Sequence, residues 1–117
     1  MRVLHSHIVN GKVNPQLAFR VRGEGDQRGM STDWSKYSTP EETRGRVRSG
    51  RSQDDYGVLR MNVGEVRGIP NQLVKHRPLD NNRAHTDVTG PVGSKTEVTK
   101  IRYLFSRICA WAIRCDA

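Results

Sequence analysis

The chain has 117 residues, of which 34% are hydrophobic, and a formal net charge of +8 at pH 7. This length suits a single domain spanning residues 1–117 with one modest core, and the composition is polar without being so depleted that disorder is expected. The sequence has no apolar run of the roughly 18 residues that a membrane span needs, and its first residues do not resemble a signal peptide. We therefore expect a cytoplasmic protein with no membrane partner.

Arginine dominates the positive charge, with 15 arginines against five lysines. Its planar guanidinium pairs with phosphate or carboxylate through two parallel hydrogen bonds, which a lysine cannot do. The expected partner is RNA or another polyanion, with an acidic protein as the alternative. GC-rich coding also produces arginine-rich chains, and in that case the charge has no functional meaning.

The N-terminal part predicts short strands. Residues 2–9 are β-branched and alternate loosely, and the Asn10-Gly11 pair that follows is the commonest two-residue hairpin turn, with residues 12–13 as the partner strand. Residues 17–22 alternate between apolar side chains and arginines. They predict a half-buried strand with an arginine face.

A short helix is predicted to begin at Pro40. Thr39 can cap it, Pro40 fits its first position, and Glu42 can complete a capping box. The helix would continue to about residue 51 and would place three arginines on one face: Arg44, Arg48 and Arg51. Such a stripe either faces water or follows phosphates.

Residues 57–63, 73–76 and 84–88 have the composition of strands, and residues 64–70 predict a turn or a single helical turn. A capping box at Ser94 and Glu97 then opens an amphipathic helix whose apolar stripe continues to Cys115.

The chain has two cysteines, Cys109 and Cys115. Within one helix they would lie about 9 Å apart along the axis, too far for a disulfide. The predicted fold is therefore α+β: a small antiparallel sheet of about four to five strands, a short surface helix and a C-terminal amphipathic helix packed on the sheet.

Short segments spread over roughly residues 14–113 carry a resemblance: Phe19-Arg20, Gly29-Met30-Ser31-Thr32-Asp33-Trp34, Thr39-Pro40-Glu41-Glu42, Gly57-Val58, Val63-Gly64-Glu65-Val66-Arg67, His76-x-Pro78 and Asn82-Arg83-Ala84-His85. The pattern resembles a set of short uncharacterised bacterial proteins. The resemblance implies that these segments belong to one domain, and it carries no activity.

Residues 76–90 hold the densest chemistry, because half of the chain's four histidines lie in this polar stretch. RNA cleavage through the 2′-hydroxyl needs a base, an acid and cations on the developing phosphorane charge, and two histidines can fill the first two roles without a metal. We predict His76 and His85 as this pair. Hydrogen-bonded turn histidines are the structural alternative.

Other residues have supporting roles in this hypothesis. Asp87 or Asn82 would orient an imidazole, and phosphate would be held by Arg77, Arg83 and Arg20. The protein would then be a ribonuclease-like toxin or effector.

The alternative without catalysis is a module that binds RNA or DNA through its arginines, with Trp34, Tyr37 and Tyr56 available to stack on bases, or a protein-interaction subunit.

A third hypothesis is ADP-ribosyl chemistry on NAD, with Arg20, Ser31 and either Glu65 or Tyr56. A metal site at His5, His7, His76 and His85 lacks cysteine or acidic neighbours. We therefore predict neither a cofactor nor a metal.

Overall fold

The computed structural model describes residues 1–21, 29–47, 49–90 and 94–115. Its fold is α+β, as predicted, but its eight described strands form three small antiparallel sheets instead of one. The first sheet has the order β1 (Arg2–Leu4), β5 (Tyr56–Arg60), β8 (Ala110–Ile113); the second has the order β4 (Met30–Asp33), β7 (His85–Thr89), β6 (Leu73–His76); and the third pairs β2 (Ile8–Val9) with β3 (Lys12–Val13).

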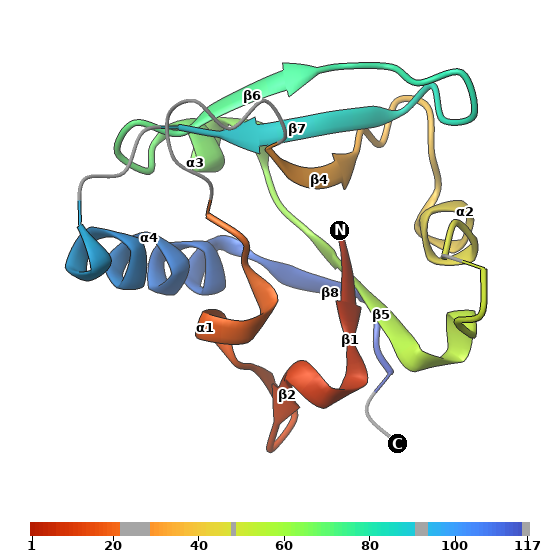
Figure 1. Cartoon of the computed structure of the whole chain (residues 1–117), viewed down its shortest axis with the longest axis horizontal. Helices are drawn as coiled ribbons and strands as arrows, with labels where there is room; N and C mark the ends of the chain where they lie inside the picture. Colours follow the sequence, from red (N-terminus) through yellow and green to blue (C-terminus); the bar gives the residue numbers. More distant parts are fainter. Residues whose placement is uncertain (22–28, 48, 91–93, 116–117) are drawn as a thin grey trace.

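The two three-stranded sheets lie in separate layers, with helices at their sides (Figure 1). In this view α1 and α4 lie to the left of the β1–β5–β8 sheet and α2 lies to the right. The described helices are α1 (Pro15–Ala18), α2 (Pro40–Gly45), α3 (Val63–Arg67) and α4 (Lys95–Ile108), with single 3-10 turns η1 (His5–His7) and η2 (Gln53–Asp55). None of them is long and apolar enough to cross a membrane.

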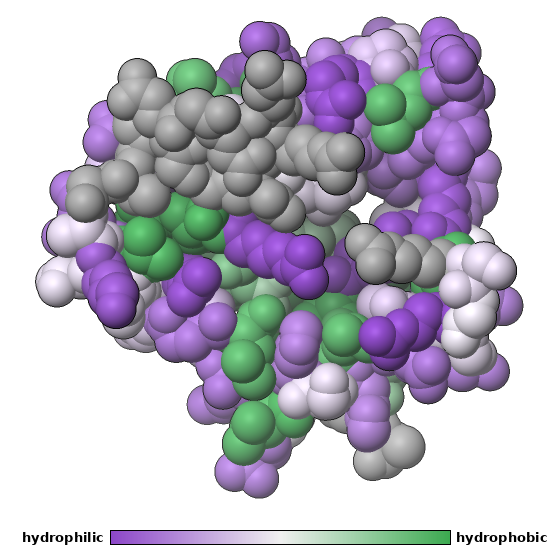
Figure 2. Space-filling model, viewed as in Figure 1, coloured by the Kyte–Doolittle hydropathy of each residue, from purple (hydrophilic) through white to green (hydrophobic). Residues whose placement is uncertain are grey.

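The core lies between the two larger sheets and α4. Its largest fully buried side chains are Phe19, Leu59 and Phe105, and the rings of Phe19 and Phe105 stack with centroids 5.5 Å apart. The other members of the core are Met1, Val3, Met30, Val66, Ile69, Val88 and Ile101. Exposed hydrophobic side chains gather elsewhere, over α1 and β2 (Figure 2).

The Asn10-Gly11 hairpin is confirmed. Both residues have positive φ angles, 52° and 75°, as the tight turn between β2 and β3 requires. The predicted strand over residues 2–9 is interrupted by η1 and so becomes two short strands.

The predicted strand over residues 17–22 is wrong. The side chain of Asn14 accepts a hydrogen bond from the backbone N–H of Gln16, and Pro15 occupies the first helical position, so the segment begins as the helical turn α1. Phe19 then turns into the core, while Arg20 is exposed. Residue 22 lies outside the described residues.

The capping box at the start of α2 is confirmed. The backbone N–H of Glu42 donates to Thr39 Oγ1 at 3.2 Å, and the backbone N–H of Thr39 donates to Glu42 Oε1 at 3.1 Å. The helix ends at Gly45 instead of near residue 51, so the predicted arginine stripe does not form on one helix. Arg48 lies outside the described residues.

The C-terminal helix starts as predicted, with Ser94 accepting from the backbone N–H of Glu97, and it buries Ile101 and Phe105. It ends at Ile108, and the prediction that it continues to Cys115 is wrong. Residues 110–113 form β8, because the edge of β5 offers them unpaired backbone groups. Cys109 and Cys115 do not form a disulfide.

We predict that Phe105→Ala lowers the free energy of unfolding by about 3–5 kcal/mol, because it leaves a cavity beside Phe19. Tyr103→Ala on the same helix removes a ring that is 50% exposed and should cost less than about 1 kcal/mol. Urea denaturation followed by circular dichroism measures both. Equal losses in the free energy of unfolding would contradict the orientation of α4, with Phe105 in the core and Tyr103 at the surface.

Candidate functional site

The residues of the candidate site lie on the β4–β7–β6 sheet, where side chains alternate between two faces. Ser31 and Asp33 of β4 pair with Asp87 and His85 of β7, so these four side chains share one face. The other face carries Met30, Thr32, Val74, His76, Thr86 and Val88, of which Met30 and Val88 belong to the core.

The two predicted catalytic histidines lie on opposite faces of this sheet. His76 is the cross-strand partner of Thr86, which is the residue after His85. Because successive side chains of a strand point to opposite faces, the two imidazoles diverge. The structure therefore does not bring His76 and His85 together as an acid–base pair.

His85 belongs to a polar cluster with Ser31, Arg77 and Asp87. Its Nε2 lies 2.9 Å from Asp87 Oδ1, and its Nδ1 lies 3.4 Å from Ser31 Oγ. Arg77 pairs through Nε with the other oxygen of Asp87. This hydrogen bond and the charge of the carboxylate raise the pKa of Arg77. Asp87 therefore holds the predicted position beside an imidazole.

Two groups face Nε2 of His85: Asp87 Oδ1 at 2.9 Å and Arg77 Nη2 at 3.1 Å. A carboxylate can only accept and a guanidinium can only donate, so Nε2 can satisfy one of them. We assign the proton to Nε2, because the contact with Asp87 is the shorter one and Arg77 already donates to Asp87 through Nε. Nδ1 is then the nitrogen with a free lone pair, and it faces the hydroxyl of Ser31. This arrangement suits His85 as a proton acceptor for Ser31.

Asn82 contacts a carboxylate instead of an imidazole. Its side-chain amide donates to Asp33 Oδ1 at 2.8 Å, while Thr43 Oγ1 and Arg46 Nη1 donate to Asp33 Oδ2 at 2.8 and 2.7 Å. Asp33 thus joins β4, α2 and the β6–β7 loop. Burial alone would raise the pKa of Asp33, but the bonds from Asn82 and Thr43 and the charge of Arg46 outweigh it and lower this pKa.

His76 belongs to an aromatic cluster with Trp34 and Tyr37. The His76 ring stacks on Tyr37 with centroids 5.6 Å apart and meets the edge of Trp34 at 5.1 Å. Its Nε2 donates to the backbone carbonyl of Arg83 at 2.8 Å. Trp34 is 38% exposed.

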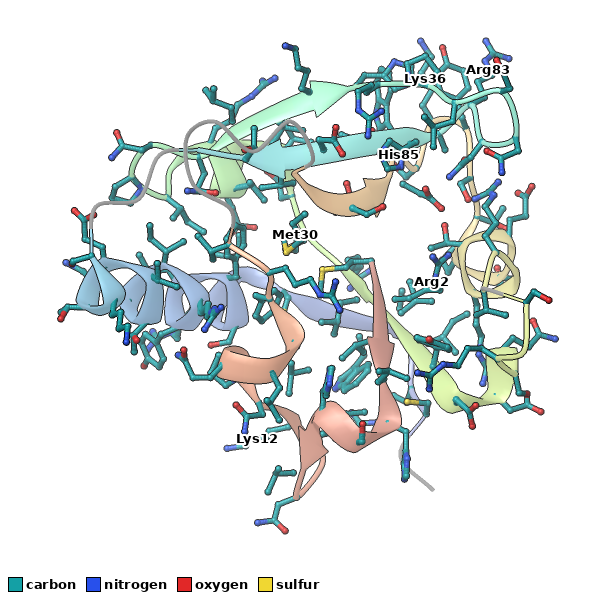
Figure 3. The ribbon with its side chains drawn as sticks, viewed as in Figure 1. Arg2, Lys12, Met30, Lys36, Arg83 and His85 are labelled. Atoms are coloured by element: carbon teal, nitrogen blue, oxygen red, sulfur yellow. The ribbon has the colours of Figure 1, made fainter. Side chains whose placement is uncertain are left out.

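Two cations lie against these rings. The guanidinium carbon of Arg83 is 4.0 Å from the centroid of Tyr37, and Lys36 Nζ is 5.3 Å from that of Trp34. Figure 3 shows Lys36 and Arg83 together at the end of the sheet where β6 leads into β7. The surface over this end is mostly hydrophilic (Figure 2).

A groove of about 980 Å³ opens between the two larger sheets, beside the aromatic cluster. Trp34 and His76 line it together with Thr32 and Thr86, and Leu59 is among its apolar residues. The rings of the cluster therefore border a space that a flat group can enter.

Arg20, the third predicted phosphate ligand, lies elsewhere. It follows α1, which packs against α4. The residues proposed for NAD chemistry, Ser31, Tyr56 and Glu65, lie on β4, β5 and α3. Among the described residues, no group of three or more histidine, cysteine, aspartate or glutamate side chains is placed to hold a metal ion.

Sequence reasoning missed the cluster around Asp33, including Thr43 and Arg46. Their contacts span ten and 13 positions along the chain, and neither residue stands in a recognisable motif. Comparison with family models, curated proteins and solved structures finds no match, so the assignment of function depends on this geometry.

We predict that Asp33→Asn lowers the free energy of unfolding by about 2 kcal/mol at pH 7, because two charge-assisted hydrogen bonds are weakened. Folding lowers the pKa of Asp33 below its ordinary value of 3.8, so the ionised carboxylate stabilises the folded protein above about this pH. This stabilisation is lost as the pH falls through the pKa of the folded state. The difference between variant and wild type should therefore shrink below about pH 4.

Urea denaturation at pH 7 and at successively lower pH values measures this difference. Asp54→Asn is the control, because the Asp54 side chain is 84% exposed and its pair with Arg44 is long, at 3.8 Å. It should cost less than about 0.5 kcal/mol. A constant difference between Asp33→Asn and wild type at all pH values would contradict the assignment.

Proposed function

We propose that the protein binds single-stranded RNA at the aromatic cluster. The observation that carries this proposal is the position of two cations, Lys36 and Arg83, against the rings of Trp34 and Tyr37 at the border of a groove. Proteins that bind single strands combine aromatic rings, on which bases stack, with cations that track the phosphates. In this protein the aromatic rings and the cations lie together at one end of the β4–β7–β6 sheet.

A phosphate backbone at the cluster would pass two exposed cations, Lys36 and Arg83, at the end of the sheet where β6 leads into β7 (Figure 3). The net charge of +8 would attract a polyanion over longer distances. A cytoplasmic location, which is part of the proposal, would bring the protein to its RNA.

A single strand fits this geometry better than a duplex. Bases of a duplex are stacked on one another, whereas unpaired bases can be splayed onto aromatic side chains. The groove beside Trp34 and His76 gives such a base space next to the rings.

We propose binding in place of the predicted cleavage. Cleavage by a pair of histidines needs both imidazoles at one phosphodiester, one at the 2′-oxygen and one at the leaving oxygen. His76 and His85 lie on opposite faces of the sheet, and so one phosphodiester would not reach both. The ribonuclease-like toxin or effector has no support from this geometry.

We predict that Trp34→Ala weakens binding of a fluorescein-labelled single-stranded RNA about tenfold, because one stacked base is worth about 1–3 kcal/mol. Fluorescence anisotropy measures the dissociation constant. Tyr103→Ala is the matched control, because it removes an exposed ring with an arginine, Arg107, beside it on α4. It should leave the affinity unchanged, and equal losses in the two variants would exclude the aromatic cluster.

We predict that Arg83→Ala lowers the slope of log affinity against log salt concentration by about 0.7, because one phosphate contact is lost on a single strand. Arg51→Ala, at an exposed position outside the cluster, should leave the slope unchanged. Anisotropy titrations at several salt concentrations measure both slopes. Wild-type affinity for RNA that does not depend on salt would contradict the proposed phosphate contacts.

A further inference from the structure

Ser31, His85 and Asp87 form a hydrogen-bonded row on the face of the sheet opposite to the aromatic cluster. The side chains of His85 and Asp87 are only 9% and 6% exposed, whereas Ser31 is exposed. A reactant in solution can therefore reach this row through the Ser31 hydroxyl. RNA binding makes no use of this row.

The row has the order of groups that activates a serine. Asp87 accepts from Nε2 of His85, and the free lone pair of Nδ1 faces Ser31 Oγ. A carboxylate that fixes the tautomer of an imidazole, which in turn faces a hydroxyl, is the arrangement that turns a serine into a nucleophile. The separation of 3.4 Å between Oγ and Nδ1 lies in the range seen before a substrate tightens the contact.

We propose that Ser31 is the nucleophile of an esterase site, with His85 as general base and Asp87 as a positioning residue. The substrate class is a carboxylic ester that carries a negative charge. This activity goes beyond RNA binding and stands on different residues on the opposite face of the sheet.

The reaction proceeds through an acyl-serine. Ser31 Oγ attacks the carbonyl carbon and gives its proton to His85 Nδ1; the bond between that carbon and the alcohol oxygen breaks, and the alcohol takes the proton from Nδ1. Water then attacks the acyl carbon and gives a proton to Nδ1, and Ser31 Oγ leaves with that proton. The sum is ester plus water to carboxylic acid plus alcohol.

The charge of the substrate follows from the neighbours of Ser31. In the sheet register Ser31 lies opposite Asp87, and Asp87 lies opposite Lys75, so the exposed lysine is on the same face, two strands away. Arg77 lies beside the row with its side chain 44% exposed. Arg77 beside the row and Lys75 across the same face favour an ester whose acyl part ends in a carboxylate.

The most direct test is covalent labelling with a fluorophosphonate probe. Ser31 Oγ would displace fluoride from phosphorus while His85 accepts the proton, and peptide mass spectrometry would place the adduct on Ser31. Labelling should vanish in Ser31→Ala and slow at least about 100-fold in His85→Gln. Ser35→Ala, at another exposed serine, should label at the wild-type rate.

Two further measurements separate catalysis from a structural role. Asp87 holds the imidazole in place, so labelling of Ser31 should slow at least about tenfold in Asp87→Asn, and Asp87→Glu, which keeps a carboxylate, should restore part of the rate. The other charged groups on this face near His85, which are Asp33, Lys75 and Arg77, stay the same in both variants. Circular dichroism verifies that each variant is folded. The experiment that locates the adduct on Ser31 uses the wild-type protein and does not depend on any variant.

The substrate class is tested with two 4-nitrophenyl esters. The monoester of glutarate should be hydrolysed with a kcat/KM at least about tenfold above that of the neutral butyrate, and Lys75→Ala should reduce this ratio several-fold. Absence of a Ser31 adduct in the folded wild type, or labelling that does not depend on His85, would overturn the proposal. Ser31→Ala should still bind RNA, so a failure of the esterase proposal can be distinguished from a failure of the RNA-binding proposal.

Discussion

The hydrogen bonds that converge on Asp33 are the constraint on which the rest of the site depends. Three donors from two other segments, Asn82, Thr43 and Arg46, meet one buried carboxylate at the end of β4. The next residue along the chain is Trp34, and the residue after Asn82 is Arg83. One carboxylate therefore anchors both the strand that presents the aromatic rings and the loop that presents a cation to them.

The alternation of side chains across the β4–β7–β6 sheet divides the chemistry into two sites. The face toward the groove holds His76 in the aromatic cluster, and the opposite face holds His85 beside Asp87 and Ser31. A shift of one residue in the pairing of β6 with β7 would have placed both imidazoles on one face. The register therefore decides between one candidate site for phosphodiester cleavage and two separate candidate sites.

Local features of the chain could be predicted from its sequence, and features set by distant contacts could not. The capping box at Thr39, the N-cap at Ser94 and the turn at Asn10 depend on neighbouring residues, and all three are present. The end of α4 depends on the free edge of β5, about 50 residues earlier, and so periodicity alone extended the helix too far. The residues around His85 could be named from the composition of residues 76–90. Their division between two faces of the sheet could be seen only from the strand register, and the role of Asp33 only from the packing of α2 against β4.

The proposed function depends on the stacking of single-stranded RNA on Trp34. The chain has two tryptophans, and the second, Trp111, lies on β8 in the other sheet, so their side-chain N–H signals provide a probe and an internal reference. The most direct measurement is a titration of ¹⁵N-labelled protein with a short single-stranded RNA, followed by NMR. If RNA stacks on Trp34, the Trp34 signal shifts and saturates together with the amides of Lys36 and Arg83, while the Trp111 signal stays in place. Binding that leaves the Trp34 signal unmoved would contradict it.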